Sequence, residues 1–150
     1  MSLDVYLEVV TPVKRMTGTG VYVRSNGSIV ELTANGVRNL YPDAMLDMTP
    51  QEYETDRVYS ANITHNLNKM AAEANIYKHL WHPDEIGVTH ARQLIEPLEV
   101  GLALLRSDPD RFRKFNPVNG WGNYEGLVSF VRDYLAACRE YPDAMVRVWA

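Results

Sequence analysis

Residues 58–71 read VYSANITHNLNKMA and hold the clearest change of pattern in the chain. The stretch opens with apolar and aromatic residues that favour a strand. Apolar residues then recur at spacings of three and four, which places them on one face of a helix: Leu67, Met70, Ala71 and Ala74. Thr64 or Asn66 is suited to cap that helix. The stretch therefore predicts a strand that leads directly into a helix.

Further strands are expected at both ends of the chain. Residues 3–9 alternate apolar and polar side chains, apart from Tyr6, which is typical of a half-buried strand. Residues 145–149, MVRVW, have a similar character. Because short isolated strands are not stable, we expect 145–149 to pair in the same sheet as 3–9 or 57–61.

The region from 11 to 56 carries turn signals. Asn26-Gly27 lies between two apolar runs and supplies the positive φ angles of a tight hairpin turn. Asn35-Gly36 indicates another turn, and Thr49 with Pro50 favours the start of a short helix. We interpret 11–56 as an elaboration on one edge of the sheet. With 57–150 as the main helical part, the whole chain is expected to form a single domain.

Four helical segments are expected after the central strand and its helix. One short piece covers 76–81, and Thr89 is expected to cap a long helix that ends near Arg106 and is kinked at Pro97. Asp108 caps a short helix, and the last helix covers 124–140. The two long helices carry apolar stripes: Ala91, Leu94, Ile95, Leu98, Leu102 and Leu105 in the first, and Leu127, Val128, Val131, Leu135 and Cys138 in the last. This order predicts an α+β fold, in which a small mixed or antiparallel sheet from both chain ends packs against three to four helices.

Composition narrows the functional classes. The chain has 150 residues and a net charge of −4, so it lacks the basic surface expected of a protein that binds duplex nucleic acid. Its single cysteine, Cys138, cannot form an internal disulfide and lies in an apolar helix stripe, which favours a buried thiol and a reducing compartment. No apolar run approaches the ~20 residues of a membrane span. We expect a cytoplasmic protein without a membrane partner, and a homo-oligomer stays open.

Two polar stretches stand out as candidate sites. The first follows the central strand and the second precedes the last helix, and together they supply eight candidate ligand-binding residues: Asn62, Thr64, His65, Asn66, Asn119, Trp121, Asn123 and Tyr124. Amide, hydroxyl and imidazole groups both donate and accept hydrogen bonds, and Trp121 and Tyr124 offer stacking faces. Both stretches lie at helix starts, so we expect them to converge on one pocket. The alternative is that these side chains cap helices and close turns.

Histidine is expected at the centre of the site. His65 at the mouth of a helix should be neutral, with one donor and one acceptor nitrogen. The other histidines, His79, His82 and His90, lie near Asp84 and Glu85, but their spacing matches no strong metal motif. We therefore expect no bound metal and no cofactor.

A resemblance covers about 58–150 and the first strand. NITHNL at 62–67 is followed by Met70-Ala71, by Leu80-Trp81 with PDE at 83–85, and by NGWG at 119–122 with Tyr124-Glu125. This set resembles a family of small uncharacterised proteins of phages and phage-derived bacterial loci, against which 11–56 looks like an insertion. The resemblance implies a phage protein in the host cytoplasm and carries no established activity. By analogy with other small phage proteins, it suggests an anti-defence role, such as sequestering a nucleotide signal.

Three functional hypotheses follow from the sequence. The leading one is a protein that binds a small polar ligand, with nucleotide-derived molecules as the first class, between the 62–66 and 119–124 stretches. The second is a hydrolase in which His65 acts as general base or metal ligand. The third is a protein–protein interaction module, without a small-molecule site, that uses exposed aromatic residues such as Trp121 and Trp149.

Overall fold

A computed structural model describes residues 1–13, 19–43 and 52–150. The described chain divides into two compact units, one formed by Met1–Val10 with Thr55–Ala150 and the other by Thr11–Glu54. This division lies close to the ends of the elaboration expected at 11–56. The helix start expected at Thr49 and Pro50 lies outside the described residues.

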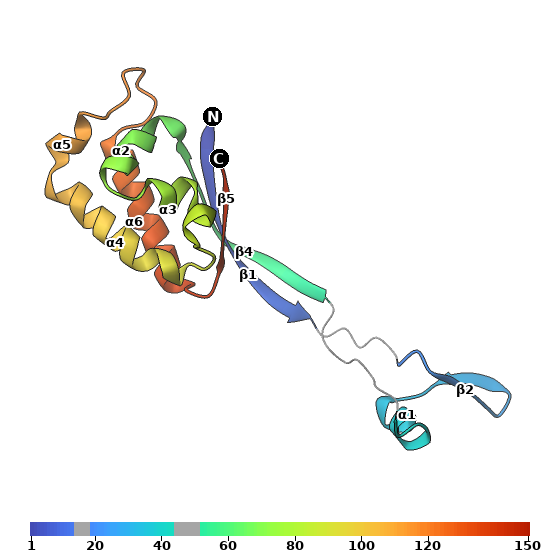
Figure 1. The fold of residues 1–150 in the computed structure, drawn as a ribbon. Helices are drawn as coiled ribbons and strands as arrows, with labels where there is room; N and C mark the ends of the chain where they lie inside the picture. Colours follow the sequence, from blue (N-terminus) through green and yellow to red (C-terminus); the bar gives the residue numbers. More distant parts are fainter. Residues whose placement is uncertain (14–18, 44–51) are drawn as a thin grey trace. The chain divides into compact units, whose positions relative to one another are not determined.

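The first unit is built on a three-stranded sheet whose order is β4-β1-β5 (Figure 1). These strands are β1 (Ser2–Val13), β4 (Glu52–Thr64) and β5 (Met145–Trp149). β5 runs antiparallel to β1, with Asp4 opposite Trp149. The expected pairing of the two chain ends is therefore confirmed, and β4 begins before Arg57, where the sequence placed its start.

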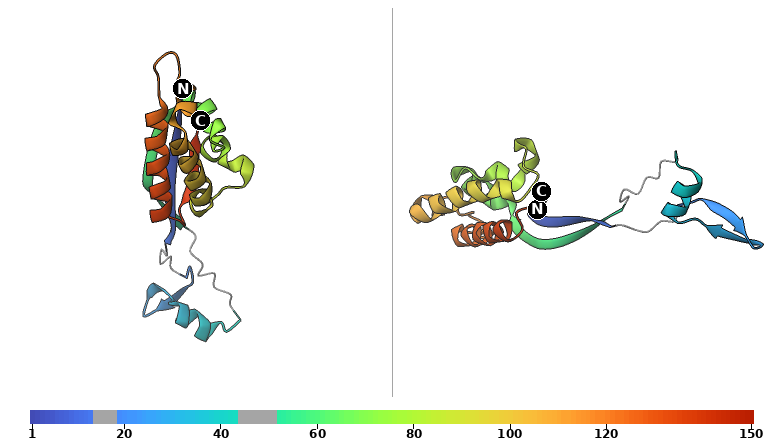
Figure 2. Two further views of the ribbon diagram at one scale, coloured as in Figure 1. Left: turned by 90° about the vertical axis from the view of Figure 1, so that its left-hand side faces the viewer. Right: turned by 90° about the horizontal axis from the view of Figure 1, so that it is seen from below.

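The helices of this unit lie on one face of the sheet (Figure 1). They are α2 (Asn68–Glu73), α3 (Tyr77–Trp81), α4 (Arg92–Ser107), α5 (Pro109–Arg113) and α6 (Tyr124–Glu140), with 3-10 turns η1 (His65–Leu67) and η2 (Pro83–Ile86). The two long helices, α4 and α6, pack against each other (Figure 2). An antiparallel sheet from both chain ends, covered by helices, confirms the expected α+β class.

The core of the first unit lies between the sheet and the helices. Alternate residues of β1 are fully buried there: Leu3, Val5 and Leu7. Both long helices bury the expected stripes, although Ile95 and Val128 are only partly covered. Every member of this core comes from residues 3–9 or 58–148. The described core residues of the first unit therefore all belong to that unit.

The start of α4 differs from the prediction. The helix begins at Arg92, and Thr89 does not cap it. Instead, Oε1 of Gln93 accepts hydrogen bonds from the backbone N–H groups of Thr89 and His90, at 2.8 and 2.9 Å. The backbone N–H groups of Ala91 and Arg92 donate to carbonyls of Ala144 and Pro142. The helix start is thus satisfied by a side chain inside the helix and by the segment before β5. α4 continues through Pro97.

The second unit contains the predicted hairpin and one helix. β2 (Tyr22–Ser25) and β3 (Ser28–Glu31) pair antiparallel, and the turn places Asn26 and Gly27 at φ 49° and 81°. The prediction of a turn at Asn35-Gly36 is wrong. Both residues lie in α1 (Ala34–Leu40), because Oγ1 of Thr33 accepts from the Gly36 N–H and caps a helix there.

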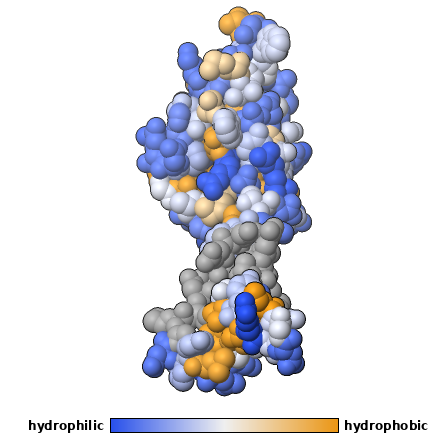
Figure 3. All heavy atoms as spheres, turned by 90° about the vertical axis from the view of Figure 1, so that its right-hand side faces the viewer, coloured by the Kyte–Doolittle hydropathy of each residue, from blue (hydrophilic) through white to orange (hydrophobic). Residues whose placement is uncertain are grey.

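Apolar side chains of the second unit are exposed to an unusual degree. Figure 3 shows apolar residues gathered on its surface. The exposed members are Tyr22, Ile29, Val30, Leu40, Tyr41 and Tyr53, whereas Val37 is buried. A hairpin and a short helix offer too little interior to cover them.

Candidate functional site

The end of β4 is held by its own polar side chains. Oγ1 of Thr64 accepts from the Asn66 N–H over 3.3 Å and so caps the η1 turn. The α2 helix that follows, for which the sequence suggested Thr64 or Asn66 as cap, has Leu67 at its N-cap and no side-chain cap. Nδ2 of Asn62 donates to Oδ1 of Asp4 on β1 over 2.6 Å. Asn62 and Thr64 therefore fix where the strand stops and the chain turns.

The loop before α6 is organised by three asparagines. Oδ1 of Asn116 accepts from the Tyr124 N–H, Oδ1 of Asn119 from the Trp121 N–H, and Oδ1 of Asn123 from the Gly126 N–H. The distances are 2.8, 3.0 and 2.7 Å. Because the backbone is held in this way, the Trp121 ring is displayed to solvent, with 71% of the residue exposed.

The two loops touch each other. Nδ2 of Asn66 donates to the backbone carbonyl of Trp121 over 3.4 Å. Gly122 has φ +92°, and a Cβ there would come within 2.6 Å of Cγ2 of Thr64. Only glycine permits both this backbone angle and this close approach. The expected convergence of the two polar stretches is therefore present in the fold.

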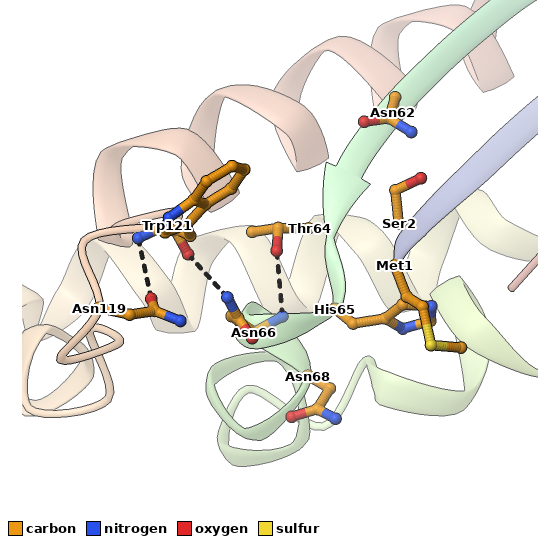
Figure 4. Close-up of a pocket in the computed structure, with 9 residues that line it drawn as sticks. All are labelled: Met1, Ser2, Asn62, Thr64, His65, Asn66, Asn68, Asn119 and Trp121. Atoms are coloured by element: carbon orange, nitrogen blue, oxygen red, sulfur yellow. Dashed lines mark hydrogen bonds between the residues drawn. The ribbon is translucent and has the colours of Figure 1, made fainter.

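A hollow of about 800 Å³ opens where the loops meet. Six of the eight candidate residues line it, together with three that were not among those eight: Asn62, Thr64, His65, Asn66, Asn119 and Trp121, with Met1, Ser2 and Asn68. Figure 4 shows the side chains of Asn66 and Asn119 on the Trp121 side of the β4 end and His65 beside Met1 on the other. The hollow thus joins an aromatic and amide-rich side to a side that contains the start of β1.

Two candidate residues do not line this hollow. Asn123 is the N-cap of α6, and its side-chain oxygen is used by the Gly126 N–H. Tyr124 is 6% exposed, and its hydroxyl donates to the carbonyl of Leu105 over 2.7 Å. The first residue of a helix with an apolar stripe can turn inward, and Tyr124 does so. The expectation that Tyr124 approaches the pocket is wrong.

His65 is tied to the core through Trp81. The indole Nε1–H of Trp81 donates to Nδ1 of His65 over 2.8 Å. Because an indole nitrogen only donates, Nδ1 must present its lone pair, and the ring proton then lies on Nε2. Nε2 is buried and has no hydrogen-bond partner among the residues that the structure describes. The acceptor nitrogen of His65, Nδ1, is therefore already in use by Trp81.

A second hollow, of about 940 Å³, adjoins the first. The two share four lining residues, namely His65, Asn66, Asn68 and Asn119. The second also contains Lys69, Lys114 and Phe115. The sequence placed Lys114 in a short basic cluster that solvated helix faces commonly show, and it gave no signal that Lys69 would lie nearby.

The remaining histidines line neither of these two hollows. His82 contacts the Tyr77 hydroxyl through Nε2 at 3.1 Å, and His90 contacts the Thr89 hydroxyl at 2.8 Å. Burial lowers the pKa of His79, against a smaller opposing effect from the Asn75 backbone. Within the three described ranges, no three residues among His, Cys, Asp and Glu lie close enough together to hold a metal ion.

Cys138 has the character that its position in the apolar stripe predicted. The residue is fully buried in α6, and burial raises the pKa of its thiol to about 12. The thiolate is the reactive form, so Cys138 is a core residue rather than a nucleophile.

Comparison with known proteins assigns the chain to no family. No protein-family model matches the chain, and no curated protein or solved structure matches it either. The resemblance to small phage proteins therefore stays a prediction. No helix in the described part of the chain is both long and apolar enough to cross a membrane.

Proposed function

We propose that the protein binds a small polar ligand that contains a flat ring, and that nucleotide-derived molecules are its ligand class. The observation that carries this proposal is the exposed Trp121 beside a hollow lined by four asparagines: Asn62, Asn66, Asn68 and Asn119. An aromatic side chain at this degree of exposure is available for stacking by a base. The asparagines provide hydrogen bonds for its edge.

Two of these asparagines are oriented before any ligand arrives. The Trp121 carbonyl requires a donor, so Asn66 turns its Nδ2 toward it, and the Trp121 N–H requires an acceptor, so Asn119 turns its Oδ1 toward it. Asn66 is left with its oxygen and Asn119 with its amino group. One acceptor and one donor beside a stacking surface are complementary to the donor–acceptor edge of a nucleobase. Such preorganisation lowers the entropic cost of binding.

The geometry of His65 supports binding over hydrolysis. A general base needs an unprotonated nitrogen within reach of a water or hydroxyl. In His65 the unprotonated nitrogen, Nδ1, accepts from Trp81, and Nε2 is buried. A metal ligand would need the same lone pair. His65 is better suited to holding the β4–η1 turn against Trp81 and forming one wall of the hollow.

The phage setting suggested by the resemblance adds a class of ligands to the test. A small phage protein that sequesters a host nucleotide signal would act against defence signalling, and it would require binding without turnover. We therefore include cyclic dinucleotides and other signalling nucleotides beside common nucleosides and nucleotides.

The test is a calorimetric titration of the protein with this panel, repeated on Trp121→Ala and Trp121→Phe. We expect Trp121→Ala to weaken binding by about tenfold or more, because one stacked base contributes on the order of 1–3 kcal/mol. Trp121→Phe keeps a ring and should lose less. The melting temperature of both variants should stay near that of the wild type, since the ring is exposed. Absence of binding across the panel at millimolar concentration would overturn the proposal.

A further inference from the structure

We propose that the ligand carries phosphate, and that Lys69 and Lys114 bind this phosphate in the second hollow while the ring lies against Trp121. The inference rests on the proposed function and names the chemical class of its ligand. It assigns a role to two side chains outside the eight candidate residues.

The two hollows together form a surface with different chemistry at each end. Trp121 and Ser2 belong to the first hollow only, and Lys69 and Lys114 belong to the second only. Between them lie the residues that both share, among them Asn66 and Asn119. A molecule that covers both hollows meets an aromatic face, then neutral amides, then two ammonium groups. That order matches the base, sugar and phosphate of a nucleotide.

Lys69 and Lys114 differ from most other cationic side chains of the first unit, because those side chains are paired with a carboxylate. The cations within 4 Å of a carboxylate are Arg57, Lys78, Arg92, Arg111, Arg113, Arg132, Arg139 and Arg147. No such pairing is present for Lys69 or Lys114 among the residues that the structure describes, and no described Asp or Glu lines either hollow. In a chain of net charge −4, this is a locally positive surface.

An ion pair connects α5 with the end of α2. Arg111 of α5 donates to Oε1 of Glu73 at the end of α2, with an Nε–Oε1 distance of 2.9 Å. This contact joins the element that precedes Lys114 to the element that contains Lys69. Lys114 follows α5 directly, and Lys69 lies in the first turn of α2. The fold therefore brings together two cations that lie far apart in the sequence.

The type of cation favours phosphate over a planar carboxylate. Arginine binds a carboxylate through two parallel hydrogen bonds, whereas lysine acts as a point charge with three rotatable donors. Two lysines from different elements can surround a tetrahedral group that presents oxygens in several directions. A mononucleotide and the end of a dinucleotide share this chemistry, so both belong in the test.

The experiment compares each nucleoside with its 5′-mono- and diphosphate, and cyclic dinucleotides with the corresponding linear dinucleotides, by calorimetry at two salt concentrations. In the wild type, phosphate should improve affinity roughly tenfold or more, and added salt should reduce this gain. In Lys69→Gln/Lys114→Gln, the nucleotide should bind no better than the nucleoside. Both side chains are exposed, so folding should be unaffected. Lys78→Gln is the matched control, because Lys78 pairs with Glu85 and lines neither hollow.

The outcomes separate the two proposals. Equal wild-type affinity for nucleoside and nucleotide would overturn the phosphate assignment and leave the proposed function standing. A gain from phosphate that survives in the double variant would overturn the assignment to these lysines. Binding of neither nucleoside nor nucleotide would remove the proposed function itself. Binding of single-stranded oligonucleotides alone would show that the hollows track a polymer backbone and would contradict a small ligand.

Discussion

At the scale of single residues, two buried tyrosines of α6 form a natural comparison. Tyr134 is fully buried, and its hydroxyl has no hydrogen-bond partner in the described part of the chain. Burial raises the pKa of this hydroxyl well above its usual value. The Tyr124 hydroxyl, in contrast, donates to the Leu105 carbonyl. Removing either hydroxyl from water costs free energy. A protein hydrogen bond offsets that cost for Tyr124, and none does so for Tyr134 in the described part of the chain.

We expect Tyr134→Phe to leave the free energy of unfolding unchanged or to raise it by about 1 kcal/mol, since it removes a buried polar group without a partner. Tyr124→Phe should lower it by about 0.5–1.5 kcal/mol, because the Leu105 carbonyl loses its donor. Urea denaturation of both variants measures the difference. A larger loss in Tyr134→Phe than in Tyr124→Phe would contradict this account.

At the scale of elements, α4 depends on one glycine. A Cβ at Gly101 would come within 2.4 Å of Cγ2 of Ile76, which precedes α3. Gly101 is buried, so the backbone of α4 lies directly against this isoleucine. Helix propensity alone would favour alanine at position 101, because glycine in a helix interior is about 1 kcal/mol less favourable than alanine.

We expect Gly101→Ala to destabilise the protein by about 1–3 kcal/mol in spite of its better helix propensity, because the added methyl group overfills the contact. Ile76→Ala creates space at the same place, so the double variant should be more stable than the sum of the two single changes implies. A double-mutant cycle by chemical denaturation provides the measurement. A stabilising Gly101→Ala would show that α4 can move away from Ile76 at little cost.

Some helix boundaries and turns follow from the local sequence, and others do not. The bounds of α6 were predicted because its stripe and its asparagine cap are local. The start of α4 was not predicted, since its carbonyl partners come from Pro142 and Ala144, far along the chain. The turn at Asn35-Gly36 failed because Thr33 caps a helix at that place. Local signals were thus reliable only where no remote or competing hydrogen bond replaced them.

In the candidate site, too, some residues could be predicted from the local sequence and others are placed there only by the fold. Six of its residues were predicted because each polar stretch is dense in hydrogen-bonding side chains and lies at a helix start. Met1 and Ser2 were missed, since they reach the hollow only through the pairing of β1 with its neighbours. Lys69 and Lys114 were missed because they lie on separate elements and line one hollow only in the folded chain. Tyr124 was misplaced because a helix-start residue can face the core.

At the scale of the whole molecule, the first unit draws all of its described core residues from its own two segments. Its core residues all lie in 3–9 and 58–148, and Val37 of the second unit is not among them. β1 and β4 are neighbours in the sheet, so their ends can be joined directly. Such antiparallel neighbours need only a tight turn between them.

We expect a chain in which Val10 is joined to Thr55 through a short glycine-containing turn to fold, with a melting temperature within about 5 °C of the full chain. Calorimetry and near-ultraviolet circular dichroism measure this, and the ligand affinity of the shortened chain should match the full chain because both hollows belong to the first unit. A shortened chain that loses its fixed aromatic environment would mean that residues 11–54 are required for folding.

The place of Met1 and Ser2 in the wall of the hollow matters for how the protein is handled. A purification tag fused to Met1 would begin inside the hollow, beside His65, and would compete with any ligand for the same space. A tag after Ala150 would begin in the adjacent small hollow, which Met1, Ser2 and His65 also line. An affinity handle inserted in the exposed turn at Asn26-Gly27 avoids both chain ends, and neither of these residues lines either hollow. Ligand screens on end-tagged protein would therefore give false negatives.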